Sequence, residues 1–204
     1  MARTRPNRPS ATPPNARQFG VVVALCALVA LAASIALLYS ELAHLTNPYA
    51  DAQCDINALI GCGTSMHSPQ AHLLWGLPNS VAGIMAFTVL LLVGLLQLSR
   101  TALPRWLWAG LVLGSCGGLA WVAYFAYQSI MVFHALCPYC TVVWLMTIPT
   151  AVFIVGYALA AGHLPGRELG RHLWSFRWLY TCALLVVLFL AVVIGLRDQI
   201  AAVL

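Results

Sequence analysis

Residues 137–161 read CPYCTVVWLMTIPTAVFIVGYALAA, an apolar run that opens on two cysteines spaced as C-x-x-C. The run is long enough to cross a membrane as a helix, because about 20 apolar residues span the hydrocarbon core. Cys137 and Cys140 therefore lie at the mouth of a membrane helix. In the first helical turn the N–H groups lack helical partners and the backbone dipole is positive, and both effects favour a thiolate.

Cys137 and Cys140 are expected to share one helical face. Thiolates are the nucleophiles of thiol–disulfide exchange, and C-x-x-C is a common redox spacing. The pair therefore predicts a redox centre. Taken alone, it is equally compatible with a structural disulfide or with half of a zinc site.

The composition indicates an integral membrane protein. Of the 204 residues, 62% are hydrophobic and 7% are charged, and the mean hydropathy is +0.88. Soluble domains have about 25% charged residues. The net charge is +5, but all basic residues are arginines between apolar runs, so they indicate membrane topology and not nucleic-acid binding.

Five apolar runs are long enough to span a membrane, which predicts an all-α membrane protein. The first run follows a basic segment, as in a signal peptide, but it is longer than the apolar part of such peptides, so we expect it to remain. The predicted organisation is a disordered basic tail over 1–19, one transmembrane domain over 20–204 with spans at 20–40, 78–98, 106–128, 137–161 and 178–196, and an outer loop over 41–77.

The arginines predict the orientation of these spans. With the amino terminus in the cytoplasm, nine of the ten arginines lie inside and only Arg197 lies outside, as the positive-inside rule requires. Loop 41–77 and the Cys137 end of the fourth span then share the outer face of a bacterial cytoplasmic membrane. Both are exposed to the compartment in which disulfides persist.

The outer loop carries a second cysteine pair, in CDINALIGC at residues 54–62. Cys54 and Cys62 can close a small ring, and Gly61 lets the backbone turn tightly there. Residues 70–77 are predicted to form a short helix, either a half-helix lid over the bundle or an ordinary loop helix. The other cysteines lie inside apolar runs and are interpreted as inert hydrophobic residues: Cys26, Cys116 and Cys182.

Two cysteine pairs on one side of a membrane have the layout of an electron relay. Oxidation of a dithiol releases two electrons and two protons, and a lipid-soluble quinone accepts both. Trp144, one turn below Cys140, either stacks on a flat ring or is an ordinary packing residue. Asn79 either donates a hydrogen bond to a quinone carbonyl or caps its helix.

Four motifs, in this order, resemble the vitamin K epoxide reductase family in its bacterial form. They are CDINALIGC at 54–62, Ser68, WGLPNSVAG at 75–83 and CPYC at 137–140. The resemblance covers about residues 20–161. It implies a four-helix bundle around a quinone, with a fifth transmembrane helix and with the outer loop and its half-helix as a lid.

The resemblance also implies roles for the site residues. Cys137 and Cys140 would be the active pair, with Cys140 facing the quinone, and Cys54 and Cys62 would bring electrons from a thioredoxin-fold partner. Asn79 would bind the quinone and Ser68 would support the site. Trp144 stands where vertebrate members have tyrosine, which favours thiol oxidation over epoxide reduction.

We therefore expect a membrane dithiol:quinone oxidoreductase that uses menaquinone or ubiquinone. Its partner would be a separate secreted or membrane-anchored thioredoxin-fold protein, reoxidised for disulfide formation in exported proteins. The sequence leaves open whether Cys54 or Cys62 meets that partner, and the glycines on either side of Cys62 favour Cys62. Two alternatives are reduction of a quinone epoxide and a non-enzymatic zinc site made of four cysteines. None of the five acidic residues falls within a predicted span, which disfavours a proton-coupled transporter.

Overall fold

The computed structural model describes residues 15–203 except for 47–54, 56, 58 and 63–75. Cys54, Ser68 and most of the predicted half-helix lid lie outside the described residues. The predictions made for them therefore stay predictions.

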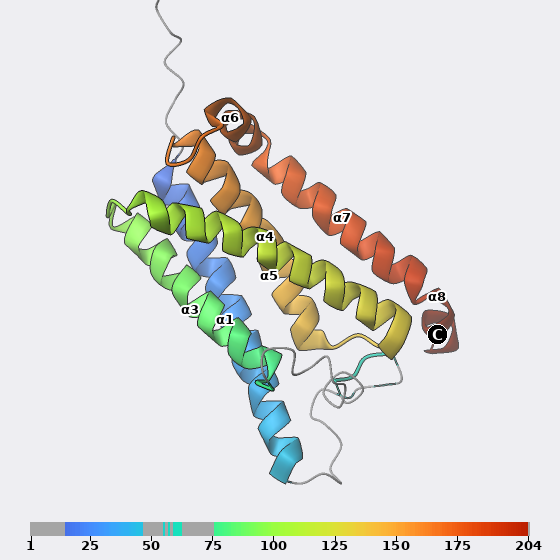
Figure 1. The fold of residues 1–204 in the computed structure, drawn as a ribbon. Coiled ribbons are helices and arrows are strands. Elements are labelled where there is room, and N and C mark those ends of the chain that lie inside the picture. Colours follow the sequence, from blue (N-terminus) through green and yellow to red (C-terminus); the bar gives the residue numbers. More distant parts are fainter. Residues whose placement is uncertain (1–14, 47–54, 56, 58, 63–75, 204) are drawn as a thin grey trace, which may run out of the picture.

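Within the described residues, five helices are long and apolar enough to cross a membrane, so the all-α membrane fold is confirmed (Figure 1). Two short helices follow the fourth and fifth spans. The elements are α1 (Ala16–Thr46), α3 (Asn79–Leu98), α4 (Arg105–Gln128) with its π-helical continuation η2 (Ser129–Phe133), α5 (Pro138–Ala160), α6 (Arg167–Ser175), α7 (Arg177–Gly195) and α8 (Arg197–Val203).

Helix α1 is longer than the predicted first span at both ends. Asn15 Oδ1 accepts the backbone N–H groups of Arg17 and Gln18 at 3.1 and 3.2 Å, which is the geometry of an N-cap asparagine. Residues 16–19, assigned to the basic tail, are therefore helical, and Phe19 is fully buried. At the other end, Glu41 belongs to the helix and not to the outer loop.

Helix α1 packs between α3 and α5 through small residues. A Cβ at Gly94 of α3 would lie 2.7 Å from the backbone nitrogen of Ala24, and Ala27 and Ala30 are completely buried. Small side chains let membrane helices approach closely, where packing replaces the hydrophobic effect. This contact forms one wall of the bundle.

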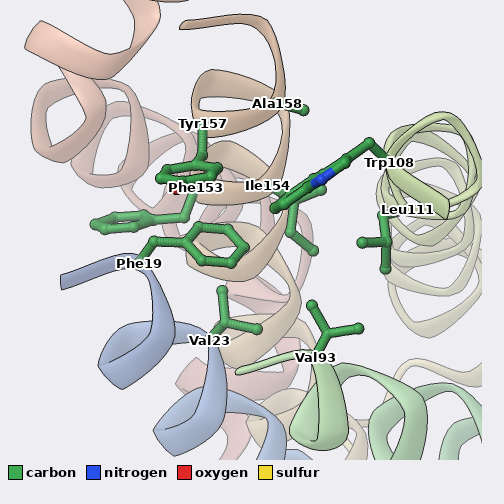
Figure 2. Close-up of a cluster of buried hydrophobic side chains, with 9 residues drawn as sticks. All are labelled: Phe19, Val23, Val93, Trp108, Leu111, Phe153, Ile154, Tyr157 and Ala158. Carbon is green, nitrogen blue, oxygen red and sulfur yellow. The ribbon is translucent and has the colours of Figure 1, made fainter. Parts of the chain in front are cut away.

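An aromatic cluster closes the bundle at the end where α1 begins and α5 finishes (Figure 2). Phe19 of α1 stacks on Tyr157 of α5 at a centroid distance of 4.5 Å, and Trp108 of α4 lies 5.3 Å from Tyr157. Val93 of α3 is buried in the same cluster. Four helices are thus joined at this end, and space remains between them toward the other.

Residues 162–177, which connect the predicted fourth and fifth spans, contain helix α6. A Cβ at Gly170 would lie 2.3 Å from the backbone nitrogen of Ala160, so only glycine allows α6 to cross α5 this closely. Helix α7 lies outside the bundle beside α5 (Figure 1), and most of its surface is exposed and apolar. Such a surface suits contact with lipid.

Candidate redox site

Cys137 is the N-cap residue of α5. Its backbone is extended and Pro138 follows as the first helical residue, a position where the missing N–H has no consequence. The Cys137 sulfur accepts the backbone N–H of Cys140 at 3.4 Å. The sulfur thus takes the place that a serine or aspartate oxygen occupies at most helix starts.

The N-cap position changes the acidity of this thiol. Hydrogen bonds from the Cys140 thiol and from the backbone N–H groups of Cys140 and Tyr139 lower the pKa of Cys137, while burial and the negative charge of Glu41 oppose this effect. The side chain is only 3% exposed. Cys137 is therefore a protected nucleophile, as exchange chemistry requires.

Backbone pairing brings the loop cysteine Cys62 to this thiol. Ile60 forms an isolated parallel bridge with Leu136. The Leu136 N–H donates to the Leu59 carbonyl at 2.8 Å, and the Gly61 N–H donates to the Leu136 carbonyl at 3.0 Å. The bridge sets the register of the loop, so that Cys62 arrives beside Cys137.

The two sulfurs are in contact. Cys62 Sγ lies 3.3 Å from Cys137 Sγ. Cys62 is disulfide-bonded, whereas Cys137 and Cys140 are free thiols. A thiol in contact with a disulfide sulfur is the arrangement from which exchange proceeds.

In this arrangement the Cys62 sulfur is fully buried against Cys137. Which of Cys54 and Cys62 meets the soluble partner stays a prediction, and this burial favours Cys54 over the expected Cys62. The zinc alternative needed four thiolates, and a sulfur engaged in a disulfide is not a thiolate ligand.

Polar side chains shape the loop around Cys62. Asp55 Oδ1 accepts the Cys62 N–H at 2.6 Å, and Asn57 Oδ1 accepts two N–H groups further along the loop at 3.0 and 2.8 Å. A Cβ at Gly61 would lie 2.6 Å from Asp55 Oδ1. The described φ angles include no positive value at Gly61, so this glycine gives room to Asp55 and does not make a left-handed turn.

A cavity of about 630 Å³ lies between α1, α3, α4 and α5 and reaches both thiols of the C-x-x-C pair. Its lining is mainly apolar. On α4, a Cβ at Gly110, Gly114 or Gly117 would meet no atom within 4 Å, so their missing side chains leave the space open. We had not singled out these glycines, although their spacing places them on one helical face.

Asn79 and Trp144 both line this cavity. Asn79 is the first residue of α3, but the N-cap is Pro78 and no side chain caps the helix. The capping alternative for Asn79 is therefore wrong. Trp144 is 3% exposed and packs beside Cys140 and Val122, so it is a packing residue that also forms part of the cavity wall.

Glu41 and Ser80 were not predicted as part of the site. Ser80 Oγ donates to Glu41 Oε2 at 2.6 Å, which ties α3 to α1, and both residues line the cavity. We expected no acidic residue within a span, but Glu41 lies within α1, because this helix continues beyond the predicted end of the first span to Thr46. The sequence signal that could have predicted this extension of α1 is the helical pattern that continues beyond residue 40.

A buried dithiol at the start of a membrane helix, in contact with a disulfide sulfur and with an apolar cavity, places the protein among membrane thiol oxidoreductases. Residues 21–155 match the vitamin K epoxide reductase family, which is more than half of the chain. The chain belongs to that family of quinone-linked thiol oxidoreductases. A comparison with curated proteins found no match.

Proposed function

We propose that this protein oxidises a thioredoxin-fold disulfide donor and passes the electrons to a quinone, thereby supporting disulfide formation in exported proteins. The observation that carries the proposal is the 3.3 Å contact between Cys62 and Cys137 at the mouth of a cavity between the spanning helices. This contact connects the outer loop, which a soluble protein can reach, with the cavity, which a lipid-soluble molecule can enter.

The proposed sequence begins when a thiolate of the reduced partner attacks Cys54, because Cys62 is buried. The released Cys62 thiolate attacks Cys137 in the Cys137–Cys140 disulfide and releases Cys140. The partner's second thiol then attacks the mixed disulfide, so that the partner leaves with its own disulfide and Cys54 is released. The Cys54 thiolate attacks Cys62 in the Cys62–Cys137 disulfide and releases Cys137. The products are a loop disulfide and two thiols, the oxidation states found for Cys62, Cys137 and Cys140.

The quinone, menaquinone or ubiquinone, is proposed to bind in the cavity as the electron acceptor. Cys140 reaches the cavity from α5, Asn79 offers an amide that can donate to a carbonyl, and Trp144 offers a flat apolar face. Pockets of about 300–1,000 Å³ with a few polar groups are typical of small-molecule sites. We propose that Ser68, whose position lies outside the described residues, supports this site.

The proposed location is the bacterial cytoplasmic membrane, with the cysteines outside and the amino terminus inside. Arginines stand at the starts of α4, α6 and α7, and these helix starts lie at the end of the bundle opposite the start of α5 (Figure 1). Arg177 donates to Gln18 Oε1 at 2.7 Å, and Arg105 donates to the Gly162 carbonyl at 3.3 Å. This distribution supports a cytoplasmic position for that end.

Trapping of the partner tests the proposal. In a Cys62→Ala variant Cys54 is a free thiol that attacks the disulfide of the oxidised thioredoxin-fold protein and releases that protein's second thiol. The mixed disulfide should accumulate, because the Cys62 thiolate that would displace the partner from Cys54 is missing. A Cys54→Ala variant is the matched control and should trap none. In vesicles with added quinone, wild-type protein should oxidise that partner and Cys140→Ala should not, and oxidation by Cys140→Ala at the wild-type rate would reject the mechanism.

A second assay distinguishes the proposed thiol oxidation from reduction of a quinone epoxide. The purified protein, supplied with a dithiol reductant and a quinone epoxide, should show no turnover if the oxidase proposal is right.

A further inference from the structure

Glu41 is a carboxylate that the relay of sulfurs does not use. It lies near the outer end of α1, where it is half-buried and accepts a hydrogen bond from Ser80 at 2.6 Å. Ser80 is 3% exposed, so the carboxylate is held against α3 by a buried donor. Glu41, Ser80, Cys137 and Cys140 all line the same cavity.

The chemistry of the site needs a group that moves protons. Closing the Cys137–Cys140 disulfide releases two electrons, and reduction of a quinone to a quinol consumes two electrons and two protons. Among the described residues that line the cavity, Glu41 is the only carboxylate. Its negative charge acts on Cys137, which places it within electrostatic reach of the dithiol.

Building on the function proposed above, we propose that Glu41 carries a proton from the Cys140 thiol to a quinone oxygen. Cys137 starts as a thiolate, having released its proton to the outer water. As the Cys137–Cys140 bond forms, the Cys140 proton passes to the Glu41 carboxylate and the electron pair passes to the quinone. Protonated Glu41 then gives the proton to the nearer quinone oxygen, and the second oxygen takes a proton from outer water, which balances the reaction.

Two features fit Glu41 for this role. The Ser80 hydroxyl stabilises the charged carboxylate, so that Glu41 begins as a proton acceptor. The position of Glu41 at the outer end of a 31-residue helix places it near water, because α1 is about 46 Å long and the hydrocarbon core is about 30 Å thick. The carboxylate therefore avoids the full cost of a charge at the membrane centre.

The test separates the two half-reactions of purified wild-type protein and of four variants. Glu41→Gln removes the proton acceptor, Glu41→Asp keeps a carboxylate, and Ser80→Ala removes its hydrogen bond. Glu168→Gln is the charge-matched control, because that side chain is 94% exposed on α6. The first assay measures single-turnover electron transfer from reduced partner to the C-P-Y-C disulfide without quinone, and the second measures quinone reduction and its solvent deuterium isotope effect.

We expect Glu41→Gln to lower kcat for quinone reduction about 100-fold, as loss of a general acid–base group does. The quinone KM should stay near the wild-type value and the isotope effect should rise. The exchange half-reaction should change much less than quinone reduction, because Glu41 acts on Cys137 only through its charge. Glu41→Asp should recover part of kcat, Ser80→Ala should lower it less than Glu41→Gln, and Glu168→Gln should match wild type.

Three results would overturn the role of Glu41. One is quinone reduction by Glu41→Gln at the wild-type rate, the second is an equal loss of both half-reactions, and the third is an unchanged isotope effect. Failure of the wild-type protein to oxidise its partner with any quinone would instead reject the proposed function.

Discussion

Cys137 combines two functions in one side chain. Its sulfur caps α5 by accepting the Cys140 N–H, and the same sulfur contacts Cys62 at 3.3 Å. The hydrogen bond from the Cys140 thiol has the largest effect in lowering the pKa of Cys137, and the backbone N–H groups of Cys140 and Tyr139 add to it. The redox centre therefore lies at the N-cap of α5, because unpaired N–H groups are available there.

Substitutions at Cys137 should separate capping from chemistry. Cys137→Ser keeps an N-cap oxygen and should retain the wild-type unfolding temperature, whereas Cys137→Ala should lose about 1 kcal/mol of stability because the N–H of Cys140 loses its acceptor. Both should abolish electron transfer from the loop pair. Thermal unfolding in detergent and partner oxidation measure the two effects, and equal stability of the two variants would contradict the capping role.

The lowered pKa of Cys137 predicts a pH dependence. The folded-state pKa lies below the value in the unfolded chain, so ionisation stabilises the folded protein above the unfolded pKa, and this contribution is lost as pH falls through the folded pKa. The thiolate absorbance lost in Cys137→Ser should titrate with a midpoint below that of a cysteine in an unfolded peptide. A midpoint above that reference would show that burial and Glu41 outweigh the hydrogen bonds.

At the scale of elements, the site depends on a loop that is held in register. The pairing of Ile60 with Leu136 and the bond from Cys62 N–H to Asp55 position the loop disulfide. These contacts bring together two segments whose cysteines, Cys62 and Cys137, are 75 residues apart in the sequence. Hydropathy and helical periodicity carry no information about such a register, since both describe neighbours along one element.

Gly61→Ala should disturb this register. Its Cβ would lie 2.6 Å from Asp55 Oδ1, so Asp55 has to move away from the Cys62 N–H. The loss of one such hydrogen bond corresponds to about a tenfold change in an equilibrium, and we expect loop-to-Cys137 electron transfer to slow by that order. Gly156→Ala is a control at the opposite end of the bundle, because a Cβ there would lie no closer than 3.5 Å to its neighbours. Equal effects of the two substitutions would argue against a specific role for Gly61.

At the scale of the whole molecule, the bundle is closed at one end and hollow toward the other. The aromatic cluster of Phe19, Trp108 and Tyr157 joins α1, α4 and α5, and the cavity occupies the space beyond it, up to the cysteines. Any molecule that uses the cavity therefore meets the thiols at the end opposite the aromatic cluster. The glycines of α4 keep this space open.

Thiol labelling tests the orientation of the whole bundle. After mild reduction of intact cells, a membrane-impermeant thiol reagent should label the loop cysteine Cys54. A cysteine introduced by Ser175→Cys, at the end of α6, should react only after the cells are opened, because the arginines predict a cytoplasmic position for that end. Labelling in the reverse pattern would invert the topology and remove the oxidising compartment from the mechanism.

The sequence by itself determined the membrane class, five spans, the position of the C-x-x-C pair at a helix start and the family resemblance. It could do so because a helix in lipid satisfies its backbone bonds internally, so length and hydropathy within one segment are sufficient. Only the tertiary structure decided that Cys62 faces Cys137, that Asn79 lines the cavity without capping α3, and that Glu41 joins the site. Those outcomes depend on contacts between segments distant in the chain, which no local pattern encodes.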